Sequence, residues 1–127
     1  MGFFGASTGG GAAIVAAAER PDAVRAVVSR GGRPDLAGEA ALRRVRTPTL
    51  LIVGGADREV LELNRLALSR IGAPKSLRVI PGATHLFPEP GALEEVSRLA
   101  ADWFGTYLRA SPALGREGAT DGPSARA

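Results

Sequence analysis

The chain has 127 residues, 45% of them hydrophobic, which is enough for one modest domain with a core of useful size. The absence of cysteine excludes disulfides and a cysteine nucleophile, and a single histidine argues against a zinc site. The net charge of +3 comes from basic residues spread along the chain without aromatic interleaving, so no nucleic-acid surface is expected.

The apolar stretches are interrupted well short of a membrane span, and the N-terminus lacks the basic region of a signal peptide. These features predict a cytoplasmic protein without a membrane partner. Seventeen glycines and nine prolines indicate frequent loops, as short strands alternating with helices require.

The first residues predict a strand, a sharp turn and a helix. Apolar residues lead into Gly5-x-Ser7-x-Gly9, and an Ala-rich run follows. In a nucleophile elbow, the turn strains the serine, and glycines on either side avoid collisions between strand and helix. The backbone N–H of Thr8, at the helix start, would then face an oxyanion formed at Ser7. The alternative is a glycine-rich connection that holds a phosphate.

The pattern next predicts a helix over residues 8–19 and a buried strand over 24–28. The loop after this strand lies at the same carboxyl edge as Ser7. It carries Arg30 and Arg33, which could bind an anionic substrate. Solvated loop arginines are the alternative interpretation.

A short helix over residues 36–44 and a strand over 49–53 follow, and Gly54-Gly55 leads from the strand to Asp57. Asp57 is either a catalytic carboxylate or the N-cap of the next helix, over residues 59–71. That helix places four apolar residues at core spacing, namely Val60, Leu63, Leu66 and Ala67.

The last strand is predicted over residues 76–80, and His85 follows it. A lone histidine is often a surface or capping residue, but its place after a strand favours a catalytic base. A helix over 91–109 has its core stripe at Leu93, Val96, Leu99, Trp103 and Tyr107. From residue 110 the composition lacks periodicity, which predicts a disordered tail over 110–127.

Ser7, Asp57 and His85 each follow a predicted strand. Open α/β sheets place ligands and catalytic groups at the carboxyl ends of their strands. The chain order Ser, Asp, His is that of an α/β-hydrolase triad and differs from the orders of the chymotrypsin and subtilisin folds.

Four segments, GASTGGGAA, SRGGRPDLA, TLLIVGGAD and IPGATHLF, together resemble the C-terminal part of dienelactone-hydrolase-like proteins of the α/β-hydrolase superfamily. The resemblance runs from about Gly2 to Leu108. It implies a partial α/β-hydrolase domain over 1–109, with a mostly parallel sheet, helices on both faces and the N-terminal strands absent. Typical dienelactone hydrolases have a cysteine at the elbow, so Ser7 favours ester hydrolysis.

The sequence therefore predicts a serine hydrolase that acts on an ester or related small acyl compound without a cofactor or metal. Ser7 would attack, His85 would transfer the proton and Asp57 would orient the imidazole. In the resembling family, the second oxyanion donor follows an early strand that this chain lacks, so weak activity is expected.

Without those strands, the sheet edge near Phe3 and Phe4 would be open and apolar. A second copy or a complementing chain could cover it. The alternative function is accordingly a truncated, non-catalytic hydrolase remnant or interaction module that needs a partner chain to complete the sheet. An anion-binding domain is a third possibility, but it leaves the order of Asp57 and His85 unexplained.

Overall fold

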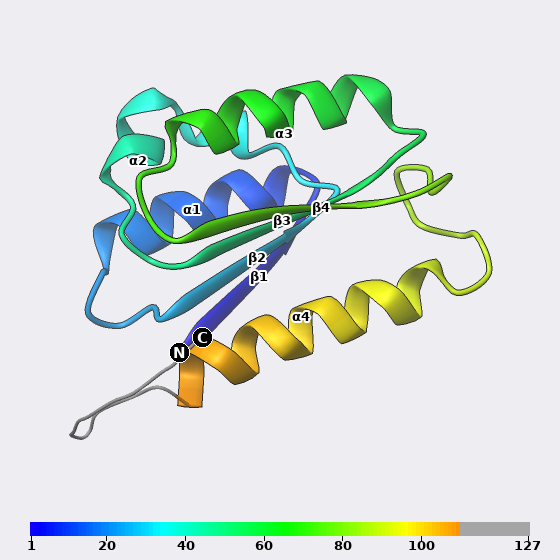
Figure 1. The fold of residues 1–127 in the computed structure, drawn as a ribbon. Helices are drawn as coiled ribbons and strands as arrows, with labels where there is room; N and C mark the ends of the chain where they lie inside the picture. Colours follow the sequence, from blue (N-terminus) through cyan, green and yellow to red (C-terminus); the bar gives the residue numbers. More distant parts are fainter. Residues whose placement is uncertain (110–127) are drawn as a thin grey trace.

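The computed structural model describes residues 1–109, so the predicted tail over 110–127 lies outside the described residues. Strands and helices alternate along the chain (Figure 1). Their order is β1 (Gly2–Ala6), α1 (Thr8–Glu19), β2 (Ala26–Arg30), the 3-10 helix η1 (Pro34–Ala37), α2 (Glu39–Arg44), β3 (Thr49–Gly54), α3 (Arg58–Arg70), β4 (Lys75–Ile80) and α4 (Ala92–Arg109).

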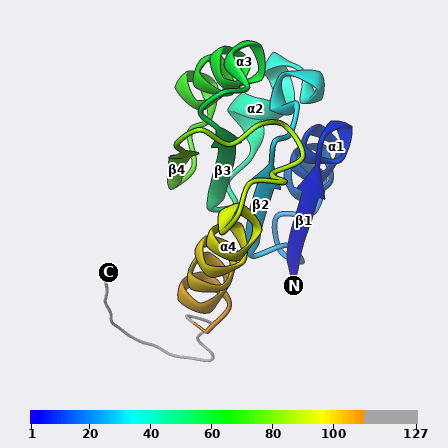
Figure 2. The same cartoon turned by 90° about the vertical axis from the view of Figure 1, so that its right-hand side faces the viewer.

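The strands form one parallel sheet in the order β1-β2-β3-β4. Helices α1, α2 and α3 cover one face, and α4 covers the other, which gives three layers (Figures 1 and 2). Because all the strands are parallel, the loops after β1, β3 and β4 meet at one edge of the sheet. The predicted α/β architecture, with helices on both faces, is confirmed.

The core has two parts, one on each face of the sheet. Alternate residues of a strand point to opposite faces, so Val27 packs toward α1 and α3, whereas Val28 packs toward α4. All six residues of β3 are buried, as expected for an inner parallel strand covered on both sides. This packing fixes the strand ends that carry the candidate site.

Two predicted elements differ from the structure by more than one residue at their ends. The strand predicted over 24–28 runs from Ala26 to Arg30, and Val24 lies before it, where its carbonyl accepts the Thr47 hydroxyl at 3.1 Å. The helix predicted over 36–44 is divided into η1 and α2 at Gly38, whose φ of 88° is incompatible with a continuous helix.

One predicted core residue in each of the last two long helices is exposed in the structure. In α3, Leu66 is 47% exposed, and the buried residues are Leu61, Asn64 and Ala67. In α4, Leu93 is likewise 47% exposed, whereas its neighbour Ala92 is buried. The other predicted core positions are largely confirmed, since Ala67 of α3 and Val96 and Leu99 of α4 are buried and Trp103 packs against the core.

Strand β1 stands at one end of the strand order and, among the described residues, pairs with β2. Phe3 packs against the core below α1, but Phe4 is 50% exposed. Phe4 is in register with Val28 and therefore faces the α4 side, where α4 packs on β2 and β3. Within residues 1–109, no helix combines the length and the apolar character needed to cross a membrane.

Candidate active site

Ser7 occupies the single position between the end of β1 and the start of α1. Its φ of 52° and ψ of −125° are unusual for a residue with a side chain and cost about 1–3 kcal/mol. An added Cβ on Gly5 would lie 2.2 Å from the carbonyl oxygen of Gly9, so strand and helix can approach this closely only with glycine there. At Gly9 itself, an added Cβ would meet no described atom within 4 Å.

Three backbone hydrogen bonds fix the strained turn. The Ser7 carbonyl accepts the N–H of Gly10 at 3.1 Å and that of Arg33 at 2.9 Å, and the Ser7 N–H donates to the Arg30 carbonyl at 3.4 Å. The loop that follows β2 therefore holds Ser7 from outside its own strand and helix.

The structure brings Ser7, His85 and Asp57 together in one hydrogen-bonded chain. The Ser7 Oγ lies 2.8 Å from the His85 Nε2, and the His85 Nδ1 lies 2.9 Å from the Asp57 Oδ2. An ionised carboxylate can only accept, so the proton belongs on Nδ1, and Nε2 is left as the acceptor for the serine hydroxyl. The Asp57 side chain is 17% exposed and that of His85 is 41% exposed, so the imidazole is accessible from solvent.

Asp57 stands at the N-cap position of α3, but its side chain makes no capping hydrogen bond. The carboxylate turns to the imidazole instead, so the side chain of Asp57 does not cap the helix. The loops that carry Asp57 and His85 also interlock: the Ala56 N–H donates to the Ala83 carbonyl at 3.0 Å. An added Cβ on Gly54 would lie 2.2 Å from the Ala83 carbonyl oxygen, so these loops pack backbone to backbone.

The His85 loop is braced on its other side by Glu89. This carboxylate accepts the Thr84 hydroxyl at 2.6 Å and the Thr84 N–H at 3.1 Å. The hydrogen bond from the Thr84 side chain lowers the pKa of Glu89 below its ordinary value. Phe87, two residues after the histidine, is 1% exposed and anchors the loop in the core below it.

The two loop arginines have different surroundings. Arg33 forms a bidentate pair with Asp35, at 3.0 and 2.9 Å, and the hydrogen bond from Arg33 lowers the pKa of Asp35. Arg30 lies with its guanidinium 5.6 Å from the centroid of the Phe87 ring, in cation–π contact. Among the described residues, Arg30 thus forms no ion pair, whereas Arg33 is paired with Asp35.

The backbone N–H of Thr8 is the first of α1, so it has no acceptor within the helix. It lies next to the Ser7 hydroxyl along the chain, at the positive end of the helix dipole. This position suits an oxyanion donor.

Two residues near the site were missed by the sequence analysis. Glu89 braces the histidine loop, and Asn64 of α3 is fully buried with its amide hydrogen-bonded to the loop after β2. The signal for Asn64 was available, because it lies four positions after Val60 and three before Ala67 in a stripe otherwise expected to be apolar.

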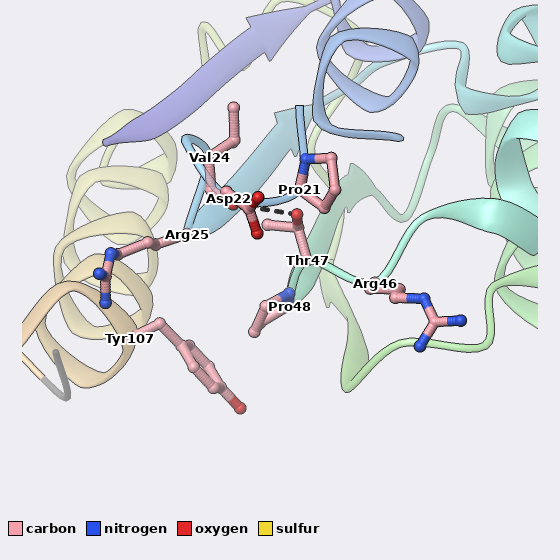
Figure 3. A pocket seen from close by; sticks show the side chains of 8 residues that line it. All are labelled: Pro21, Asp22, Val24, Arg25, Arg46, Thr47, Pro48 and Tyr107. Atoms are coloured by element: carbon pink, nitrogen blue, oxygen red, sulfur yellow. Dashed lines mark hydrogen bonds between the residues drawn. The ribbon is translucent and has the colours of Figure 1, made fainter. Parts of the chain in front are cut away.

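A pocket of about 400 Å³ lies at the opposite end of the sheet, before the starts of β2 and β3 (Figure 3). The guanidinium groups of Arg25 and Arg46 point away from each other there. The residues that line the pocket are Pro21, Asp22, Val24, Arg25, Arg46, Thr47, Pro48 and Tyr107. It therefore shares no residue with the Ser7 site.

No protein-family model matches the chain. Over 108 residues, the chain is 63% identical to a protein found in two strains of Mycobacterium tuberculosis, which carries the provisional name phosphoribosyl transferase. That match covers 85% of this chain and 24% of the relative, so the chain spans about a quarter of the curated relatives it matches.

Three hydrolases of solved structure have a fold similar to that of this chain. Dienelactone hydrolase from Anabaena variabilis is 62% identical, with a TM-score of 0.81, over 84% of this chain and 49% of that one. A CIB-like hydrolase from Thermoplasma acidophilum is 27% identical, with a TM-score of 0.66, over 80% of this chain and 48% of that one. An esterase domain from Rhodothermus marinus shares the fold at 22% identity and a TM-score of 0.75, over 84% of this chain and 61% of that one. The chain thus has the fold of the C-terminal part of an α/β hydrolase and resembles the dienelactone-hydrolase-like family over that part, with Ser7 after the first strand.

Proposed function

We propose that the chain carries the catalytic triad of a serine hydrolase that acts on an ester or related small acyl compound. The observation that carries the proposal is the continuous hydrogen-bonded chain from the Ser7 Oγ through His85 to Asp57. A nucleophile, a base within hydrogen-bonding distance and a carboxylate that orients the base are the parts this chemistry needs.

In the proposed reaction, the Ser7 Oγ attacks the acyl carbon while the His85 Nε2 takes the hydroxyl proton. The tetrahedral intermediate collapses, the ester C–O bond breaks, and the imidazolium returns its proton to the departing alkoxide. Water then repeats the sequence on the acyl-serine: His85 accepts a proton from the water and returns it to Ser7 as the acid leaves. Asp57 holds the imidazole in the required tautomer and stabilises its charged form.

The N–H of Thr8 is the proposed oxyanion donor. Each such donor is worth roughly a hundredfold to a thousandfold in turnover. We propose that a second donor comes from polypeptide seated at the β1 edge beside Phe4, either another segment or a second copy. The exposed face of Phe4 and the coverage of about half of the similar hydrolase support this arrangement.

The provisional name of the M. tuberculosis relatives belongs to proteins of which this chain spans a quarter. This chain itself has a hydrolase fold, and its Ser7, His85 and Asp57 side chains are hydrogen-bonded to one another. We therefore propose hydrolase chemistry for this part of the chain and carry the transferase name no further.

A fluorophosphonate probe, which reacts with activated serines, tests the proposal on the full chain. We expect labelling at Ser7 that is lost in Ser7→Ala and His85→Ala and strongly reduced in Asp57→Asn. In a serine protease triad, the Asp→Asn change lowers turnover about 10⁴-fold. Ser69→Ala is the matched control, because that hydroxyl lies on the exposed side of α3 and donates to the Leu66 carbonyl.

The second candidate is a non-catalytic interaction module, which the exposed Phe4 on the terminal strand favours. A folded chain that the probe does not label would support this candidate against the hydrolase. Light scattering gives an independent measurement, because an interaction through the β1 edge predicts association that Phe4→Lys abolishes.

A further inference from the structure

Asn64 is a polar residue on the buried face of α3, with 0% exposure. Its Nδ2 donates to the carbonyl of Gly32 at 3.0 Å and to the carbonyl of Val60 at 2.8 Å. Since both partners can only accept, the NH₂ group must face them, which fixes the orientation of the amide. One bond stays within the helix, and the other joins α3 to the loop after β2.

This arrangement has a local cost. The Oδ1 of Asn64 is buried and has no hydrogen-bond partner among the described residues. A buried acceptor without a partner is unfavourable, and an apolar side chain would suit the stripe between Leu61 and Ala67 better. Local packing alone therefore does not explain an asparagine at this position.

The loop that Asn64 holds touches two members of the proposed triad. The Arg33 N–H donates to the Ser7 carbonyl at 2.9 Å. An added Cβ on Gly31 would lie 3.2 Å from the His85 carbonyl oxygen and 3.5 Å from its Nδ1. The loop thus lies against both the serine turn and the histidine.

The middle of the same loop packs against the start of α1. An added Cβ on Gly32 would lie 3.1 Å from the Gly10 Cα and 3.3 Å from the Ser7 carbonyl oxygen. The loop has no room to shift toward α1, and Asn64 holds it from the other side.

We infer that Asn64 is a positioning residue of the site, and this inference rests on the proposed function. It couples α3, which begins directly after Asp57, to the loop that holds the Ser7 carbonyl and contacts His85. Asn64 touches none of the reacting atoms, so its effect acts through the mutual geometry of the three side chains. Small misplacements of reacting groups cost up to about a hundredfold in rate.

The test uses two variants of Asn64. Asn64→Leu keeps a side chain of similar size and removes both hydrogen bonds. Asn64→Asp keeps the shape of the side chain but places a carboxylate oxygen against the carbonyls of Gly32 and Val60. Ile71→Ala is the control for general loss of stability, because Ile71 is a core residue directly after the C-terminal end of α3. All variants are measured in the full chain at a temperature where near-UV circular dichroism shows them folded.

For both Asn64 variants, we expect the maximal rate of fluorophosphonate labelling at Ser7 to fall about tenfold to a hundredfold, with the probe concentration at half-maximal rate unchanged. Ile71→Ala should leave both quantities as in the unmodified chain. A merely structural role predicts that the labelling rate follows stability, so that Asn64→Leu and Ile71→Ala behave alike. That result would overturn the inference.

Hydrogen exchange separates this inference from the proposed function. Amides exchange faster where local structure opens more easily, so Asn64→Leu should increase exchange at the Arg33 and Gly10 amides, and Ile71→Ala should not. If the unmodified chain is not labelled, the hydrolase proposal fails, and the exchange data alone decide the role of Asn64. Unchanged protection of Arg33 in Asn64→Leu would refute it.

Discussion

An added Cβ on Gly5 would lie 2.2 Å from the carbonyl oxygen of Gly9 and 2.8 Å from the backbone nitrogen of Gly10. The end of β1 and the first turn of α1, which lie on either side of Ser7, are therefore in close backbone contact. The relationship is not symmetric, because an added Cβ on Gly9 would meet no described atom within 4 Å.

Gly5→Ala should accordingly destabilise the fold strongly, whereas Gly9→Ala should be tolerated. Overpacking typically costs about 1–3 kcal/mol, and here the colliding atoms are backbone that cannot rotate away. Alanine in place of a helical glycine gains up to about 1 kcal/mol. Urea unfolding of both variants checks this, and equal stability losses would contradict the contrast.

The strained φ of 52° at Ser7 predicts a conflict between stability and activity. Ser7→Gly should be more stable than Ser7→Ala, because glycine adopts a positive φ without strain. We expect its free energy of unfolding to be higher by roughly 1–3 kcal/mol and its unfolding temperature to be higher accordingly. Both variants lose the hydroxyl, so the bond to His85 cancels in the comparison. Thermal unfolding followed by circular dichroism gives the difference, and equal midpoints would show that the turn stores no strain.

Ser29 is buried behind the serine turn, and its Oγ has no hydrogen-bond partner among the described residues. Ser29→Ala should therefore leave stability unchanged or raise it by about 1 kcal/mol. The Ser29 hydroxyl is packed tightly between Gly10 and Gly32, because an added Cβ on either glycine would lie 2.3 or 2.0 Å from it. The second methyl group of Ser29→Val has no room there, so this variant should destabilise the fold. Urea unfolding distinguishes the two, and a large loss in Ser29→Ala would contradict the prediction.

The loop that carries His85 should loosen in acid. The Thr84 hydrogen bond lowers the pKa of Glu89 in the folded chain below its ordinary value, so the brace contributes its full stability at a pH above that ordinary value. That contribution is lost as the pH falls through the lower folded value. The amide proton shift of Thr84, followed by NMR, should titrate in this range in the unmodified chain and not in Glu89→Gln.

Arg30 and Arg33 should differ in their effect on charged substrates. Arg33 is paired with Asp35, whereas Arg30 has a cation–π contact with Phe87 and no ion pair among the described residues. For esters that carry a carboxylate, Arg30→Gln should raise KM by about tenfold and Arg33→Gln should change it little. Matched neutral esters are the control, and an equal effect on both substrates would rule out charge recognition by Arg30.

The sequence was sufficient to predict the order of strands and helices and the meeting of Ser7, Asp57 and His85 at one edge. Each residue follows a strongly apolar segment, and parallel strands bring such positions together. The N-cap alternative for Asp57 could not be decided in advance, because it depends on where the carboxylate turns. Similarly, the sequence did not show that Arg33 pairs with Asp35 whereas Arg30 lies against the Phe87 ring.

Features that depend on neighbouring elements were harder to predict. In α3, the exposure of Leu66 beside the buried Ala67 depends on how the helix packs on its neighbours, which the spacing of apolar residues alone does not determine. The different requirements at Gly5 and Gly9 likewise follow from the angle between β1 and α1, since both glycines fit the same motif.

The bond between Ser7 and His85 joins positions 78 residues apart. Ser7 follows β1 and His85 follows β4, and β2 and β3 lie between these two strands in the sheet. The bond therefore forms only when β2 and β3 are in place. Folds dominated by such distant contacts fold slowly, because loop closure precedes the contacts that compensate for it. Recovery of serine reactivity during refolding would therefore report the completion of the sheet, later than probes of helix formation.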